Sequence, residues 1–312
     1  MRRIFLLWFA FFFSVHLSAQ ERDPLQLKRA IDFSYANDFF FNVDYYFTQG
    51  IHLEVFLPSL RKNPISKILL KLPNGDDEAF GISANSECYT PSSIRHNYIP
   101  YGDRPYAASF FMGCSRYSLN HEKQMRLITN LDLGIMGPNA YGHEMQSGIH
   151  HLTGSQQPEG WQYQVANAPI VNYSALIEKR IFSSPFFDAN GFSQARLGCY
   201  FDDVRVGVNA RLGWLNDYFE GDNLSSPFRF WISGSGTMEV VGYNATMQGG
   251  FFTKNSYVVP TKGITRIVYC GTLGLTLVYK KLRLVYSSYF LSPEYKNGWA
   301  HNWGQASLSI LF

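Results

Sequence analysis

The chain has 312 residues, of which 46% are hydrophobic, 17% aromatic and 16% charged, and its mean hydropathy is −0.14. An ordinary soluble domain is about 25% charged, while intrinsic disorder requires more charge and fewer aromatic residues. The net charge of +3 is too balanced to suggest nucleic-acid binding. Only the N-terminus approaches the run of about 20 apolar residues that a membrane-spanning helix needs. A chain rich in glycine and aromatic residues that alternates apolar and polar positions is typical of a β-barrel whose outer face meets lipid.

Residues 1–19 predict a cleaved signal peptide. Arg2 and Arg3 supply the positive start, Ile4 to Val15 the apolar stretch, and a small residue stands at the expected cleavage point. The alternative is an uncleaved membrane anchor, which the short apolar run disfavours. Residues 20–312 then form one exported domain, which we expect in the bacterial outer membrane.

Alternation with a period of two marks strands along most of the mature chain. Candidate strands begin near residues 28, 48, 78, 104, 124, 169, 191, 204, 226, 262, 281 and 302. The last strand ends in Phe312, and a terminal aromatic residue on an amphipathic strand resembles the assembly signal of outer-membrane barrels. An even number of strands suits a closed antiparallel barrel, which has no exposed edge. The sequence therefore predicts an all-β, single-domain antiparallel transmembrane β-barrel of about twelve strands.

Two segments interrupt the strand pattern. Residues 60–77 predict a loop with a short helical turn over 66–72. Residues 138–168 form a longer loop, and loops of this length are usually functional. Within it, Gly142–Leu152 predicts an extracellular helix with Met145, Ile149 and Leu152 on one face and Gln146 and His150 on the adjacent face. Such a helix outside the barrel wall would form one side of a cleft.

The four cysteines do not form a metal-binding motif. Cys88, Cys114, Cys199 and Cys270 contain no C-x-x-C pair, which disfavours a structural zinc site. Export makes disulfides possible, but the sequence does not determine a pairing. We favour the interpretation that each is an apolar residue within a strand.

A polar cluster is predicted at the mouth of the first hairpin. Asn37 and Asp38 end the first strand, and Asp44, Tyr46 and Thr48 open the second. A carboxylate with amide and hydroxyl oxygens nearby is what a hard cation such as Ca²⁺ prefers. The alternative is ordinary turn chemistry, because Asn and Asp favour loops for backbone reasons.

Three groups of motifs follow one another in the first half of the chain. They are Asn37-Asp38 with Tyr46-x-Thr48-x-Gly50, then Gly102-Asp103-Arg104-Pro105-Tyr106-Ala107, then Gly137-Pro138 followed by Gly142-x-Glu144-x-Gln146-x-x-x-His150-x-x-x-Gly154. The ordered set resembles the outer-membrane lipid A 3′-O-deacylase family (LpxR-type). The resemblance implies a twelve-stranded barrel, in agreement with the independent strand count. It also implies a calcium-dependent active site near the outer rim, between the barrel wall and a loop helix.

The resemblance further implies a role for each matched residue. Asp38 resembles the family's calcium-associated carboxylate, and Asn37 its polar partner at the metal and the oxyanion. Thr48 falls where the family has a threonine, and His150 is similar in position to the general base. Lipid A or lipopolysaccharide is the implied substrate, with outer-membrane lipid around a barrel that we expect to be monomeric.

One departure from the family concerns a cation. The family has a lysine on the loop after a Tyr-Ser-Pro segment, whereas here Arg95 follows Tyr89-Thr90-Pro91. Arginine can hold a phosphate through two parallel hydrogen bonds, while lysine acts as a point charge. Arg95 is therefore the candidate cation of the site, and substrate preference could differ for that reason.

The residues are consistent with histidine-activated attack of water on an ester. A neutral imidazole suits the base near neutral pH, a cation stabilises developing negative charge, and Asn37 and Arg95 are candidate donors to the oxyanion. Glu144 or Gln146 is a candidate to orient His150.

Two alternatives remain open at this point. The first is a non-catalytic outer-membrane barrel or channel. The second is an outer-membrane phospholipase with a Ser–His pair, which would need Ser147 or Ser155 beside His150. No G-x-S-x-G nucleophile motif is present, which favours direct attack by water.

Overall fold

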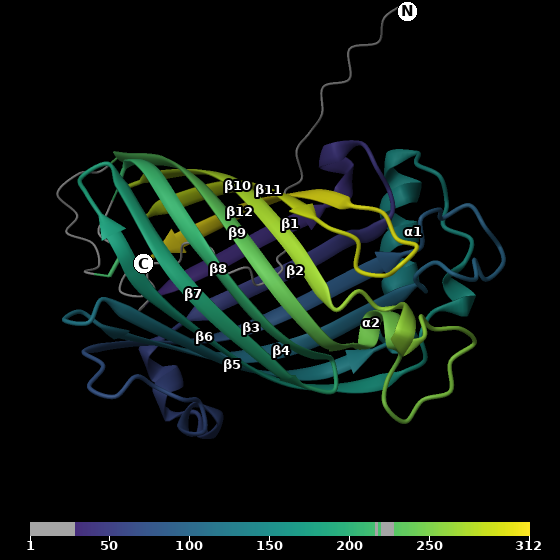
Figure 1. Cartoon of the computed structure of the whole chain (residues 1–312), viewed down its shortest axis with the longest axis horizontal. Coiled ribbons are helices and arrows are strands. Elements are labelled where there is room, and N and C mark those ends of the chain that lie inside the picture. The colour runs from purple at the N-terminus through teal and green to yellow at the C-terminus, as the bar shows by residue number, and fades with distance from the viewer. Residues whose placement is uncertain (1–28, 216–217, 220–227) are drawn as a thin grey trace, which may run out of the picture.

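The computed structural model describes residues 29–215, 218–219 and 228–312. The expected signal peptide, residues 1–19, lies outside the described residues. The described chain forms a closed barrel in which every strand pairs antiparallel with its neighbours (Figure 1). The strands are β1 (Ala30–Asn37), β2 (Tyr46–Phe56), β3 (Asp77–Thr90), β4 (Ala107–Asn120), β5 (Met125–Met136), β6 (Ala168–Ser183), β7 (Phe187–Gly198), β8 (Phe201–Trp214), β9 (Phe228–Asn244), β10 (Ile267–Tyr279), β11 (Leu282–Leu291) and β12 (His301–Leu311).

The predicted fold class is confirmed, and each strand begins within five residues of its predicted start. The barrel closes where β1 pairs with β12, with Ala30 opposite Leu311 and Asn37 opposite Gly304. Closure matters because a bilayer core contains no water to satisfy the backbone groups of an open sheet edge. No helix in the described part of the chain is long and apolar enough to span a membrane.

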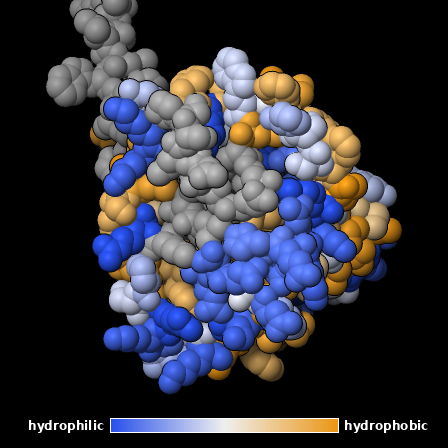
Figure 2. Space-filling view, turned by 90° about the vertical axis from the view of Figure 1, so that its left-hand side faces the viewer, coloured by the Kyte–Doolittle hydropathy of each residue, from blue (hydrophilic) through white to orange (hydrophobic). Residues whose placement is uncertain are grey.

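The alternation along each strand separates a lipid-facing surface from a polar interior. On β8, Val204, Val206 and Val208 are exposed on the outside, while Asn209 and Arg211 are buried inside. This is the reverse of a soluble barrel, and it is the arrangement expected when the outer face is solvated by lipid. In Figure 2, hydrophilic residues gather over the end of the barrel opposite α1, and hydrophobic residues gather on the flank.

Paired charges fill much of the interior. Arg126 of β5 bonds to Glu178 of β6 at 2.5 Å, and Arg211 of β8 to Asp188 of β7 at 3.0 Å. Such pairing is required because an isolated charge in a low-dielectric interior is very costly. The side chains of these pairs are almost completely buried.

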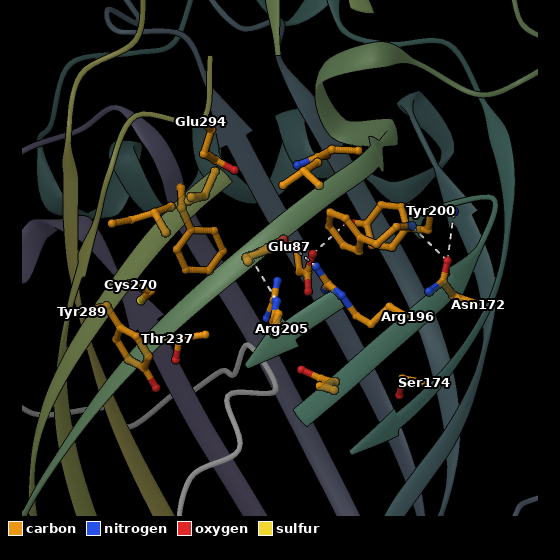
Figure 3. A pocket seen from close by; sticks show the side chains of 18 of the residues that line it. Glu87, Asn172, Ser174, Arg196, Tyr200, Arg205, Thr237, Cys270, Tyr289 and Glu294 are labelled. Atoms are coloured by element: carbon orange, nitrogen blue, oxygen red, sulfur yellow. Dashed lines mark hydrogen bonds and ion pairs between the residues drawn. The ribbon is translucent and has the colours of Figure 1, made fainter. Parts of the chain in front are cut away.

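A separate cavity of about 170 Å³ also lies inside the lumen (Figure 3). Arg196 and Arg205 reach into it from β7 and β8, and Arg205 Nε forms an ion pair with Glu239 Oε2 of β9 at 3.1 Å. Aromatic side chains also line this cavity, among them Tyr289 and Trp303, whose stacked ring centroids lie 4.8 Å apart. Asp38, Asp44 and His150 do not line this cavity.

The longer connections gather mainly at one end of the barrel, together with helix α1 (Gly142–Thr153) and the short α2 (Ala245–Gln248) (Figure 1). Outer-membrane barrels have their longer loops outside the cell, so we assign this end as extracellular. At this end lie the 3₁₀ turns η2 (Asp38–Phe41), η5 (Pro138–Ala140), η6 (Trp161–Tyr163) and η7 (Thr261–Gly263).

Two local predictions need correction. The expected helical turn over 66–72 is wrong, since the loop instead forms the 3₁₀ turns η3 (Pro58–Lys62) and η4 (Pro64–Lys67). Each starts at a proline, whose fixed φ suits the first position of a helical turn. All four cysteines are unpaired, as favoured above, but Cys199 lies in the β7–β8 turn rather than in a strand.

The lipid-facing assignment of β8 can be tested at Val206, near the middle of that strand. Replacing Val206 with Arg places a charge in the hydrocarbon layer and should reduce the free energy of folding by about 2–4 kcal/mol. The measurement is a denaturant titration of folding into lipid vesicles, followed by tryptophan fluorescence. Val206→Leu keeps an apolar side chain and serves as the control. Equal stability of the Arg and Leu variants would mean that this face does not contact lipid.

Candidate functional site

The loop between β1 and β2 places two aspartates next to each other. Asn37 ends β1 and caps η2, because its side-chain Oδ1 accepts the backbone N–H of Phe39 at 2.8 Å. The next residue, Asp38, is only 1% exposed, and its Oδ2 accepts the backbone N–H of Tyr45 at 2.7 Å. This bond draws the loop back on itself and brings Asp44 close to Asp38.

A β-bulge at the start of β2 places Thr48 in the same site. The register of β2 against β3 shifts between Phe47 and Gln49, and Phe47 packs inside the lumen. The extra residue turns Thr48 toward the loop, where its hydroxyl donates to Asp44 Oδ1 at 3.0 Å. The Gln49 amide then contacts the Met145 sulfur of α1 at 2.8 Å. Bulges of this kind often re-aim side chains beside active sites.

Helix α1 covers the outer surface of the barrel at its extracellular end. Its first residue, Gly142, lies so close to Ala108 of β4 that a Cβ atom would come within 2.4 Å of the Ala108 methyl group. Ala108 also packs with Cys88 of β3 and with Trp161 beneath the helix. Farther along the same outward-facing row of β4, Phe110 and Met112 are exposed. The helix thus caps a lipid-facing surface rather than the lumen.

The predicted helix is confirmed, but its buried face is polar. Gly142, Gln146 and His150 are its buried residues, whereas Leu152 of the predicted apolar face is 86% exposed. Burying a glutamine and a histidine requires hydrogen-bond partners, and both side chains have them.

His150 lies between two oxygen atoms. Its Nδ1 hydrogen-bonds to the backbone carbonyl of Gln156, and its Nε2 lies 3.7 Å from Asp44 Oδ2. Because a carbonyl can only accept, the network assigns the proton of the neutral ring to Nδ1. Nε2 is then the basic nitrogen, and 3.7 Å is too long for a direct hydrogen bond to the carboxylate.

Gln146 connects the helix to both sides of the site. Its carbonyl accepts from the Trp161 indole N–H at 2.7 Å, and its amide lies 3.5 Å from Asp44 Oδ1. The other candidate for orienting His150, Glu144, is exposed. Gln146 therefore reaches His150 only through Asp44, and Asp44 is the residue that faces His150.

Burial makes ionisation of the Asp38 and Asp44 carboxyl groups unfavourable. Burial raises the pKa of Asp38 well above its usual range, and the nearby charge of Asp44 adds to the shift. Burial also raises the pKa of Asp44, while His150 and the Thr48 hydroxyl lower it. Two neighbouring carboxylates with raised pKa values favour a positive partner between or beside them.

The remaining sequence candidates are less closely integrated into the site. Arg95 lies on the β3–β4 loop with an exposed side chain, and among the described residues that side chain makes no hydrogen bond or ion pair. Ser147 of α1 does not hydrogen-bond to His150 within the described chain. The Ser155 hydroxyl contacts that of Thr153 at 2.8 Å instead.

The Gly102-Asp103-Arg104 motif organises the loops around the site. Asp103 Oδ2 accepts from the backbone N–H and hydroxyl of Ser92 at 2.8 and 2.5 Å. Arg104 is fully buried and bonds to Glu294 of the β11–β12 loop at 3.1 Å and to Thr246 of α2 at 2.8 Å. This motif therefore ties three extracellular loops together and does more than form a turn.

Sequence reasoning noted Asp44 in the polar cluster but gave it no role. Its position in the sequence, four residues before Thr48 and in the same loop as Asp38, could have indicated that it belongs to the site. Only the placement of α1 reveals that Asp44 also faces His150.

Several solved structures are similar to this chain. An LpxR structure from Salmonella typhimurium superposes with a TM-score of 0.73 at 19% identity, covering 91% of this chain and 100% of that one. A KdgM porin and the β-domain of the Bordetella autotransporter Brka give TM-scores of 0.40 and 0.44, each at 9% identity and covering 91% of this chain and 99% of theirs. No curated protein matches the sequence. The family profile described as "Outer membrane protein LpxR" matches residues 5–312. The chain therefore belongs to the LpxR family of outer membrane proteins.

Proposed function

We propose that this protein is a lipid A 3′-O-deacylase, an outer-membrane esterase that removes the ester-linked 3′-acyloxyacyl chain by histidine-activated attack of water. The observation that carries the proposal is the position of His150. It is 9% exposed on the buried face of α1, which packs on the outside of the barrel, and its Nε2 lies 3.7 Å from Asp44 Oδ2. A base in this position is available to a lipid of the outer leaflet and is separate from the lumen.

The surroundings of the site support a substrate with acyl chains. Below the helix, the outward-facing rows of β2 and β4 expose Leu53, Phe110 and Met112. Acyl chains of a bound lipid can stay against this apolar wall, while an ester near the headgroup reaches the polar residues above. Binding energy from the chains then positions the ester without exposing the chains to water.

Each proposed catalytic residue has a distinct task. His150 Nε2 takes a proton from water as the water oxygen attacks the ester carbonyl, and it returns that proton to the leaving alcohol oxygen. The Asn37 amide, which now donates to the Tyr35 hydroxyl at 2.8 Å, is proposed to donate to the oxyanion. Thr48 holds the β1–β2 loop in place beside His150 through its hydrogen bond to Asp44. Arg95, exposed next to Ile94 of the cluster that packs against α1, is proposed to bind a phosphate of the substrate.

The residues also fit a calcium ion by their chemistry. Asp38 is a buried carboxylate beside a second negative charge, and Asn37 supplies an amide next to it. Within the described residues no group of three or more His, Cys, Asp or Glu side chains is placed to hold a metal. Calcium accepts amide, hydroxyl and backbone carbonyl oxygens as well, so Asp38 and Asn37 are proposed as two of its ligands. When bound, the ion would supply positive charge near the oxyanion.

The alternative functions have less support. A channel needs an open lumen, whereas buried aromatic side chains, among them Tyr289 and Trp303, pack together inside this end of the barrel. Tyr46 and Tyr295 belong to a second cluster of buried residues. A Ser–His phospholipase needs a serine bonded to the base, and Ser147 and Ser155 do not provide one. We propose that the deacylase acts as a monomer.

The base assignment predicts the behaviour of His150→Ala. Loss of the general base should lower the rate of lipid A deacylation by about 10²- to 10⁴-fold, while the barrel remains folded. Release of the acyl chain is followed by mass spectrometry of lipid A incubated with the detergent-folded protein. Heat-modifiable migration on gels checks the fold, and Ser147→Ala is the matched control on the same helix. An unchanged rate in His150→Ala would reject the base assignment, and phospholipid cleavage lost in Ser147→Ala would favour the phospholipase.

The calcium assignment predicts a change in stability that depends on Asp38. At a calcium concentration about 100-fold above Kd, binding should stabilise the fold by about 2.7 kcal/mol. Because the pKa of Asp38 is raised in the folded protein, ionised Asp38 costs stability, and protons compete with the ion as the pH falls. The rise in Tm with calcium should therefore be larger at about pH 8 than at about pH 5.

Asp38→Asn removes the buried charge but keeps an oxygen for the Tyr45 N–H. Without calcium this variant should unfold at the same temperature as the wild type or a higher one, and it should lose both the calcium response and deacylation. A full calcium shift in Asp38→Asn would show that the ion binds elsewhere.

A further inference from the structure

We infer that Asp44 is the positioning residue for His150 and the second acceptor for the attacking water. This inference rests on the proposed function. Asp44 lies on the β1–β2 loop, whereas His150 comes from α1, more than a hundred residues later in the chain. Their side chains meet only because the helix covers this part of the barrel wall.

The geometry around Asp44 leaves one oxygen directed at the base. Oδ1 accepts from the Thr48 hydroxyl at 3.0 Å and lies 3.5 Å from the Gln146 amide. Oδ2 lies 3.7 Å from His150 Nε2. Thr48 comes from the barrel wall and Gln146 from the helix, so the carboxylate is held by both.

The separation of 3.7 Å suits two acceptors that share one water molecule. A water within hydrogen-bond distance of both atoms can donate one O–H to Nε2 and the other to Asp44 Oδ2. Its lone pairs then point away from both acceptors, toward a bound ester. The Gln156 carbonyl already holds the proton on Nδ1, which leaves Nε2 free to receive one.

The attack converts the water and the ester into a tetrahedral intermediate and an imidazolium. The water O–H bond to Nε2 breaks, a bond forms between the water oxygen and the ester carbonyl carbon, and the carbonyl electron pair moves to its oxygen. The resulting imidazolium lies against the Asp44 carboxylate, which stabilises it. When the tetrahedral intermediate collapses, the ester C–O bond breaks and Nε2 returns the proton to the leaving oxygen.

Other ionisable groups near the base have weaker claims to this role. Asp38 lies on the same loop as Asp44, but its carboxylate accepts the Tyr45 N–H. Tyr106 and Trp161 pack beside the helix, and Trp161 bonds to Gln146. On α1 itself, His143, Glu144 and His151 are exposed. Asp44 is therefore the charged group that pairs with His150 Nε2.

The test compares Asp44→Asn with Glu144→Gln in the full-length, detergent-folded protein. Asp44→Asn is nearly isosteric, and its loss of a charge-assisted contact should lower kcat/KM for lipid A roughly 10- to 100-fold. Glu144→Gln also removes a negative charge from α1, but the exposed Glu144 side chain does not contact His150. The kcat/KM of this variant should therefore equal that of the wild type. Asp44→Glu should restore part of the lost rate.

Separate values of kcat and KM distinguish positioning from a merely structural effect. Asp44 is proposed to contact the attacking water and His150 but not the acyl chains, so Asp44→Asn should lower kcat and leave KM within about twofold of the wild type. Because kcat is expressed per folded barrel, measured by heat-modifiable migration on gels, a variant that only folds less well would keep the kcat of the wild type. An active wild type with an unchanged kcat in Asp44→Asn, or with equal losses in Asp44→Asn and Glu144→Gln, overturns the inference. A wild type that releases no acyl chain from lipid A overturns the proposed function instead.

Discussion

The absence of water in the bilayer core is the constraint on which the rest of this structure depends. Every backbone N–H and C=O group of the wall must find a partner in another strand, and only a closed barrel provides one for all of them. Closure between β1 and β12 then imposes a strict alternation, with apolar side chains outside and polar side chains inside. Polar chemistry directed at a lipid cannot be built on the middle of such a wall.

The position of the candidate site keeps its polar groups away from the lipid-facing middle of the wall. It lies at the extracellular end of the outer face, where a single helix shields polar groups from the lipid below. The tight approach of Gly142 to Ala108 and the cluster around Trp161 hold the helix against β3 and β4. The polar face of the helix then lies opposite the loop that carries the two aspartates.

Buried charges are paired with opposite charges in the lumen, whereas in the site two carboxyl groups lie side by side. Inside the barrel, arginines and carboxylates neutralise one another, as Arg126 does with Glu178 and Arg205 with Glu239. In the site, Asp38 and Asp44 lie close together, and burial raises the pKa of both. Groups whose ionisation is costly in this way are common where a protein binds a ligand or performs chemistry.

The sequence by itself determined the barrel and its strands, because a period of two and a lipid-facing surface leave a pattern in every strand. It also predicted the helix over residues 142–152 and, through motifs that resemble a family, a candidate site that contains His150 and Asp38. The tertiary structure decided which side chains meet. The polar face of α1 was buried instead of its apolar face, Thr48 was turned by a bulge, and Asp44 came to face His150. Those outcomes depend on how a loop helix packs against strands distant in sequence, and local periodicity contains no information about such contacts.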